Sequence, residues 1–166
     1  MMAETCLLAE STICYPPLFN ELRLLQPRPT ATTETVAMAA VAASHEQNAG
    51  AIIVMTTSGG TAAKISKYRP ACPILTSASS LYTFARCSNR HCTVTRNWQT
   101  ARQIHLHRGC YPFYYDEARP QSDADWQRDI DNRIRYGIDQ SLELGILKPG
   151  ATIIAVQGAC SSPCLR

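Results

Sequence analysis

A short stretch rich in hydroxyl groups and glycine, residues 56–61, is the part of this sequence best suited to bind an anion. It consists of Thr56, Thr57, Ser58, Gly59, Gly60 and Thr61. The apolar run 51–55 leads directly into it, and a short helix is expected to begin near Ala62. Free amides at a helix start, glycines that let the backbone close around a ligand, and hydroxyl side chains together form an anion site. An ordinary turn of small polar residues explains the same pattern, and the stretch is neither a Walker loop nor a dinucleotide-binding glycine motif.

Trp126 and Arg133 form a second candidate pair. They are seven residues apart, which is two helical turns, so on a helix they share a face. Core packing for Trp126 and a surface ion pair for Arg133 are the structural alternatives to a binding role. The same helix is expected to carry a solvated charged face, made of Asp123, Asp125, Asp129, Asp131 and Asp139.

The other reactive side chains do not assemble into a catalytic or metal site. His105 and His107 are expected on different sides of a helix, solvated or partly packed. The sequence holds eight cysteines, but the spacing of Cys87, His91 and Cys92 matches no usual zinc site. No serine–histidine–aspartate triad or carboxylate pair is recognisable. We therefore predict no catalytic residue, no metal site and no cofactor bound by this chain.

Composition indicates a single globular domain. The chain has 166 residues, 45% of them hydrophobic and 17% charged, with a formal net charge of +3. The basic residues are scattered, so nucleic-acid binding is not indicated. No apolar run is long enough for a membrane helix, and residues 1–5 lack the basic start of a signal peptide. We expect an intracellular, reducing location.

The hydrophobic pattern predicts helices that alternate with short apolar strands. Helices are expected at residues 2–15, 18–25, 34–47, 62–68, 100–107 and 123–144, and strands at 51–55, 72–75, 110–115 and 151–156. Pro16 and Pro17 should interrupt the first helical stretch, and Thr32 or Thr33 should cap the third helix. The continuous apolar run 51–55 is typical of a central parallel strand. The order predicts an α/β fold, a three-layer α/β/α sandwich with a mostly parallel sheet of about four to five strands.

Two stretches depart from this alternation of helices and strands. Residues 76–93 show no clear period and follow a strand that ends early, and the tail 159–166 stops where another element should begin. Removing 76–93 would restore a continuous strand into Val94. We hypothesise that 76–93, and the tail, are translated intron, and that 76–93 forms an exposed, poorly ordered loop.

Taken in order, the motifs closely resemble the C-terminal domain of the pyruvate kinase family over about 140 of the 166 residues. They are Thr33-Glu34-Thr35-Val36-Ala37, Gly50-Ala51-Ile52-Ile53-Val54, Thr57-Ser58-Gly59, Ser66-Lys67-Tyr68-Arg69-Pro70-Ala71-Cys72-Pro73-Ile74, Val94-Thr95-Arg96-Asn97, Thr100-Ala101-Arg102-Gln103 and His107-Arg108-Gly109-Cys110-Tyr111-Pro112. Residues 2–15 resemble the last helix of that family's catalytic barrel. The resemblance implies a remnant of barrel helix and connector at 1–25, the α/β domain at 26–158, and an aberrant tail at 159–166.

The resemblance also implies a function. In the family this domain carries an allosteric sugar-bisphosphate site and part of the subunit interface of a homotetramer, in a cytoplasmic glycolytic enzyme. Residues 56–61 resemble the loop that cradles one phosphate, and Trp126 and Arg133 match positions that contact the other. The family's catalytic lysine and its Mg²⁺ and K⁺ ligands lie in the barrel, and nothing here matches them. The Gly-rich effector loop and final strand that follow Gly158 in the family are also missing.

Three interpretations follow. The first is a pyruvate kinase fragment, comprising the regulatory domain and one barrel helix, without phosphotransferase activity of its own. The second is a free-standing module that binds a phosphorylated metabolite. The third is a small nucleotide-binding enzyme built on the strand, loop and helix at 50–62. A truncated barrel would explain residues 2–25, which favours the first.

Overall fold

The computed structural model describes residues 2–56, 58–79, 97–115 and 126–157. The helices in this part of the chain are α1 (Met2–Ser11), α2 (Tyr15–Leu24), α3 (Thr32–Glu46), α4 (Gly60–Lys67), α5 (Asn97–Ile104) and α6 (Trp126–Glu143). The strands are β1 (Ala51–Thr56), β2 (Ile74–Ser79), β3 (Cys110–Tyr115) and β4 (Ile153–Val156).

The four described strands form one sheet in the order β3-β2-β1-β4, and every neighbouring pair is parallel. Ile52 of β1 pairs with Ile74 of β2 on one side and with Ile154 of β4 on the other. β1 is therefore a central strand, as the run of β-branched residues predicted. Parallel strands also place all their carboxyl ends at one edge of the sheet, which is where loop 56–61 begins.

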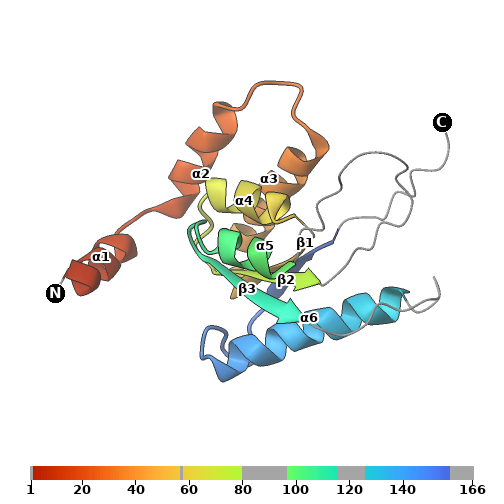
Figure 1. Cartoon of the computed structure of the whole chain (residues 1–166). Helices are drawn as coiled ribbons and strands as arrows, with labels where there is room; N and C mark the ends of the chain where they lie inside the picture. The colour runs from red at the N-terminus through yellow and green to blue at the C-terminus, as the bar shows by residue number, and fades with distance from the viewer. Residues whose placement is uncertain (1, 57, 80–96, 116–125, 158–166) are drawn as a thin grey trace, which may run out of the picture.

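Helices cover both faces of the sheet, which confirms the three-layer α/β/α architecture (Figure 1). α3, α4 and α5 lie on one face, where Val41, Ile65 and Ile104 pack with alternate residues of the strands. Of the described helices, only α6 lies on the other face, where it packs through Ile134 and Ile138 against Ile53, Leu75 and Phe113. The small side chains of α3 allow its close approach, since Ala37 and Ala40 are buried.

The N-terminal helices differ from the predicted boundaries. α1 ends at Ser11, and α2 already begins at Tyr15, with Pro16 and Pro17 in its first turn. Proline is well tolerated there because first-turn amides have no partner within the helix. Two helices are present here as predicted, but the first ends at Ser11 instead of Tyr15, and the prolines lie inside the second helix instead of before it.

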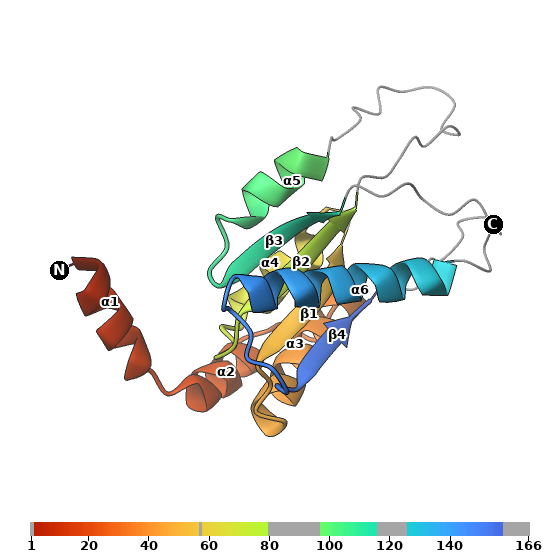
Figure 2. The ribbon, with the colours of Figure 1, turned by 90° about the horizontal axis from the view of Figure 1, so that it is seen from below.

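α1 stands away from the sheet in both ribbon views (Figure 2). Arg108 contacts its C-terminal end: Arg108 Nε donates to Glu10 Oε1 at 3.2 Å, and Nη2 donates to Tyr15 Oη at 2.8 Å. The guanidinium also lies 5.4 Å from the centre of the Tyr15 ring. One arginine thus joins α1 and the start of α2 to the loop before β3.

The start of the third helix also corrects a prediction. α3 begins at Thr32, its N-cap is Ala31, and no side chain caps it. Thr33 instead accepts a hydrogen bond from Lys64 Nζ, and Thr35 bonds to Thr30 and to the carbonyl of Ala31. The threonine hydroxyls are therefore used in tertiary and local contacts.

β2 is longer than predicted and begins later. It was expected at 72–75 but runs from Ile74 to Ser79, paired with both β1 and β3. The first four residues of segment 76–93 are therefore strand, because backbone pairing on both sides extends the ladder regardless of hydropathy. The remainder of that segment, and the tail 159–166, lie outside the described residues, so the intron hypothesis stays a prediction.

Boundaries after β2 shift by a few residues. α5 ends at Ile104, so His105 and His107 follow the helix instead of lying on it, and both are exposed. β3 matches its predicted range, α6 is described from Trp126, and β4 begins at Ile153. Within the described ranges no helix combines the length and the hydropathy needed to cross a bilayer.

Candidate anion-binding site

The start of loop 56–61 is fixed by the buried strand β1. Residues 51–54 of β1 are fully buried, and Thr56 is its last residue. α4 begins at Gly60, earlier than the predicted Ala62, so Gly60 and Thr61 belong to the first helical turn. The loop proper is therefore only residues 57–59, and the helix start lies directly beyond the carboxyl end of β1.

The loop closes on itself through side-chain hydroxyls. The Gly59 amide donates to Thr56 Oγ1 at 3.0 Å, and the Gly60 amide donates to Ser58 Oγ at 3.4 Å. Gly59 has a φ of +76°, a left-handed conformation that side chains disfavour. The glycine is thus required by the turn that reverses the chain from strand to helix.

α5 packs directly against this turn at Gly59. A β-carbon on Gly59 would lie 2.9 Å from Ile104 Cγ1 and 3.5 Å from Thr100 Cγ2. Both α5 residues are buried. The backbone of the loop therefore rests directly on α5.

The groups left for a ligand are the amides and hydroxyls of the α4 start. The first intrahelical bond runs from the Ala63 amide to the Gly59 carbonyl, so the Thr61 and Ala62 amides precede the helical ladder. Ser58 is exposed and Thr61 is half-buried, while Thr57 lies outside the described residues. Such a set can bind an anion, but it contains no acid–base pair or activated nucleophile.

Arg133 lies in a buried ion pair on the opposite face of the sheet. Its Nη2 is 2.8 Å from Asp129 Oδ2, and the exposed fractions of the two side chains are 5% and 8%. Its guanidinium lies 5.4 Å from the centre of the Tyr115 ring. A surface ion pair for Arg133 and a solvated Asp129 were therefore wrong expectations, because α6 turns this face onto the end of β3. Asp131 and Asp139 are exposed, as expected.

The structure brings Arg133 to the same edge of the sheet as the loop, without contact between them in the described residues. Thr56 ends β1 and Tyr115 ends β3, and β2 lies between these parallel strands. Figure 2 shows α6 running along the sheet with its N-terminal end toward the carboxyl ends of the strands. Within the described ranges the buried Arg133 Nε makes no hydrogen bond, whereas Nη2 is paired with Asp129. Trp126 starts α6, but its side chain is outside the described part.

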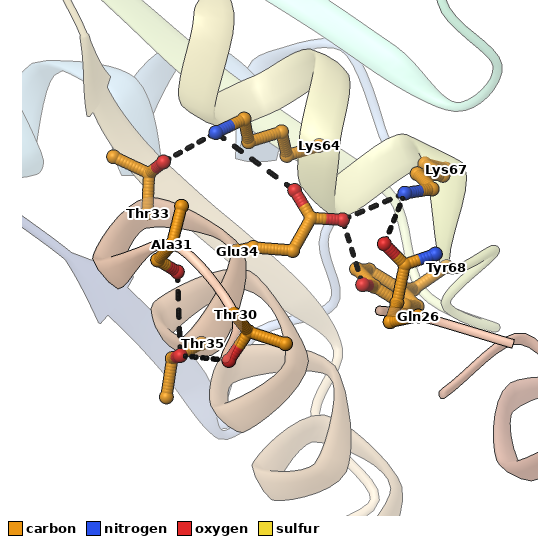
Figure 3. A network of polar contacts seen from close by, with 9 residues as sticks. All are labelled: Gln26, Thr30, Ala31, Thr33, Glu34, Thr35, Lys64, Lys67 and Tyr68. Atoms are coloured by element: carbon orange, nitrogen blue, oxygen red, sulfur yellow. Dashed lines mark hydrogen bonds and ion pairs between the residues drawn. The ribbon is translucent and has the colours of Figure 1, made fainter. Parts of the chain in front are cut away.

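Sequence reasoning missed a polar network at the other end of α4 (Figure 3). Glu34 Oε1 accepts hydrogen bonds from Lys67 Nζ and from Tyr68 Oη, each at 2.7 Å, and its Oε2 lies 3.8 Å from Lys64 Nζ. The bonds from Lys67 and Tyr68 lower the pKa of Glu34 below its ordinary value. Burial, and then the Glu34 bond, raises the pKa of Tyr68. Lys64 and Lys67 lie three residues apart on one helical face, which was the available signal. Their common partner Glu34 is 30 and 33 residues away in the sequence, so local spacing does not reveal it.

The described part of the chain offers no metal site. No three histidine, cysteine, aspartate or glutamate side chains come together within it. The ligand set for a divalent ion such as Mg²⁺ is therefore not found among these residues. Burial raises the pKa of the Cys72 thiol, and it raises that of Cys110 to about 11.

Comparison with known proteins gives one consistent result. Residues 34–162 match the family model described as the pyruvate kinase alpha/beta domain. The chain is 58% identical over 158 residues to a pyruvate kinase of Agaricus bisporus, covering 95% of this chain and 26% of that protein. Pyruvate kinases of Candida albicans and Saccharomyces cerevisiae are 48% and 46% identical, each over 95% of this chain and 27% of their own length. The chain thus spans about a quarter of the length of these relatives.

Proposed function

Since the chain belongs to the pyruvate kinase family through its α/β domain, we propose that it provides the regulatory part of such an enzyme. In this role it binds a sugar bisphosphate and contributes to the subunit interface. Phosphoryl transfer from phosphoenolpyruvate to ADP belongs to other parts of the enzyme. Mg²⁺ and K⁺ serve that reaction and are not bound by this chain, and the setting is cytoplasmic glycolysis in a homotetramer.

The geometry of the α4 start carries the proposal. A buried strand, a loop closed by the Thr56 and Ser58 hydroxyls, and a helix whose first amides lack intrahelical partners converge at one point. A phosphate placed there gains about 0.3–2 kcal/mol from the helix terminus and roughly 1.5–3 kcal/mol from each charge-assisted hydrogen bond. These terms support millimolar affinity for one phosphate, because a Kd of 1 mM corresponds to about 4 kcal/mol.

Arg133 is the proposed anchor of the second phosphate, with Trp126 shaping the wall. The ion pair with Asp129 opposes this role, since Arg133 must give up or share that partner to bind phosphate. We therefore expect weak bisphosphate binding by this chain.

Titration with fructose 1,6-bisphosphate, followed by NMR amide shifts or calorimetry, tests the proposal. Shifts should centre on Ser58, Gly59, Gly60 and Thr61. Binding should weaken in Arg133→Met, which keeps most of the side-chain volume, and should nearly vanish when Ser58 and Thr61 are both changed to Val. Thr12→Val is a matched control, because the Thr12 hydroxyl is exposed and bonds only to its own turn. Shifts that avoid 56–61 altogether would refute the assignment.

The two alternative functions are less well supported. A free-standing phosphometabolite module predicts relatives of similar length, but the matched relatives are about four times longer than the aligned stretch. A nucleotide-binding enzyme commonly uses a metal-ligand cluster near the phosphates, and no such cluster is found among the described residues.

A further inference from the structure

Glu34 contacts several residues at the end of α4 in one partly buried polar network (Figure 3). Its side chain is 12% exposed, and the same carboxylate receives Lys67 and Tyr68, the last residue of α4 and the one after it. Tyr68 is fully buried and packs edge-on against Phe19 of α2, with ring centres 6.1 Å apart. Lys64, one turn earlier, approaches the other carboxylate oxygen and donates to Thr33. The C-terminal half of α4 is thereby fixed to the first turn of α3.

The opposite end of α4 is the candidate anion site. α4 has eight residues, so it spans about 12 Å from Gly60 to Lys67. Its middle is held by Ile65, which is fully buried in the core. α4 is only about two turns long, so we expect a displacement of its C-terminal end to tilt the amides at its start.

The network also reaches the segment between α2 and α3. Lys67 Nζ donates to Gln26 Oε1 at 2.9 Å as well as to Glu34. Gln26 lies just after α2, in the segment that leads to α3. The segment between α2 and α3, residues 25–31, is called the connector below. Gln26, Glu34, Lys67 and Tyr68, together called the clamp, join it to α4.

We propose that Glu34 is a positioning residue that sets the anion affinity of residues 58–61 by fixing the orientation of α4, and that it couples this site to the connector through Lys67 and Gln26. The proposal rests on the anion site of the proposed function. Glu34 touches no ligand in this scheme. It acts through the orientation of α4, and by linkage a bound anion should in turn stabilise the connector.

The direction in which anion affinity changes when Glu34 is replaced distinguishes positioning from a simple charge effect. Glu34 carries a negative charge, so removing that charge strengthens the binding of an anion if only Coulomb interaction counts. If the substitution instead displaces α4, anion binding becomes weaker. Glu34→Gln removes the charge while keeping a hydrogen-bonding oxygen, and Glu46→Gln makes the same charge change at an exposed position of the same helix.

The experiment measures the Kd of inorganic phosphate and of fructose 1,6-bisphosphate by NMR titration for wild type, Glu34→Gln, Tyr68→Phe and Glu46→Gln. We expect roughly 3- to 10-fold weaker binding in Glu34→Gln, which lies within the span of about 2- to 30-fold found for mutations along a coupled network. Tyr68→Phe, which leaves all charges unchanged, should weaken binding by a smaller factor. Glu46→Gln should bind as tightly as wild type or slightly tighter. Equal or tighter binding in Glu34→Gln overturns the proposal.

NMR amide shifts measured without anion test the role of Glu34 independently of whether an anion binds at residues 58–61. In the absence of anion, the amide shifts of Gly59, Gly60 and Gln26 should change in Glu34→Gln and stay in place in Glu46→Gln. A purely structural role lowers the melting temperature without moving these amides, and that outcome also overturns the proposal. If wild type shows no shift at 56–61 with either anion, the anion site itself is wrong, and the ligand-free shifts still decide whether Glu34 positions α4. Should Glu34→Gln fail to fold, Tyr68→Phe carries the same comparison.

Discussion

A β-carbon built on Gly59 would lie 2.9 Å from Cγ1 of Ile104, so the loop and α5 leave no room for even a methyl group between them. Gly59 also has a φ of +76°. The turn into α4 therefore depends on glycine for two separate reasons, conformation and packing.

Gly59→Ala should lower the free energy of unfolding by about 2–4 kcal/mol, through the left-handed conformation and the overpacked contact. Gly145→Ala is the control, because Gly145 has a φ of +69° with nothing within 4 Å of its position, and it should lose only about 1–2 kcal/mol. Urea denaturation measures both. Equal losses would show that contact with Ile104 does not matter.

Asp129→Asn should destabilise the domain and release Arg133. Breaking a buried ion pair costs about 3–5 kcal/mol when one charge is left unpaired, although the amide keeps some of the contact. Asp131→Asn, at an exposed position of the same helix, should change stability by less than about 0.5 kcal/mol. Chemical denaturation checks the stability.

The same variant tests the role of Arg133 in binding. With Asp129 neutral, the affinity for fructose 1,6-bisphosphate should rise while that for inorganic phosphate stays close to wild type, because only the bisphosphate reaches both anchors. Calorimetry on the folded variant measures both. Parallel changes for the two anions would place Arg133 outside the site.

Acid should reduce the stabilisation that the clamp contributes through Glu34. The pKa of Glu34 is lowered from 4.5 in the folded state, so its ionised form stabilises the fold above pH 4.5. That contribution should be lost as the pH falls from 4.5 through the lowered folded value. Thermal melts between pH 6 and pH 3 should show a smaller acid loss for Glu34→Gln than for wild type, and identical slopes would contradict the contacts seen for Glu34.

Thiol labelling should divide the described cysteines into two groups. Cys6 and Cys14 are exposed, whereas burial raises the pKa of Cys72 and brings that of Cys110 to about 11. At pH 8 iodoacetamide should modify Cys6 and Cys14 at least tenfold faster, because the thiolate is the reactive form. Peptide mass spectrometry resolves each site, and the difference should disappear in denaturant.

This chain by itself should not transfer phosphate from phosphoenolpyruvate to ADP. Phosphoryl transfer needs metal ions that neutralise the developing charge, and in the proposed division of roles other parts of the enzyme hold them. A coupled assay should stay at the buffer blank in the presence of Mg²⁺ and K⁺. Turnover that scales with protein concentration would contradict the division of roles proposed here.

The sequence by itself determined the architecture. The apolar run at 51–55 predicted a central parallel strand, and the alternation of helices and strands predicted the layered fold, because burial on both faces of a sheet leaves a direct hydropathy signal. The ordered motifs also identified the family, and the hydroxyl and glycine content of 56–61 marked the loop. These features are local, so their residues carry the whole signal.

Only the tertiary structure decided how the remaining polar groups are used. Arg133 and Asp129 have the composition of a surface pair, yet α6 buries them against Tyr115. Glu34 and Lys67 meet across 33 positions of sequence, and the strand β2 continues to Ser79 because its neighbours pair with it. Burial and pairing of this kind depend on which surfaces the fold brings together, and that information is absent from the local pattern of residues around each group.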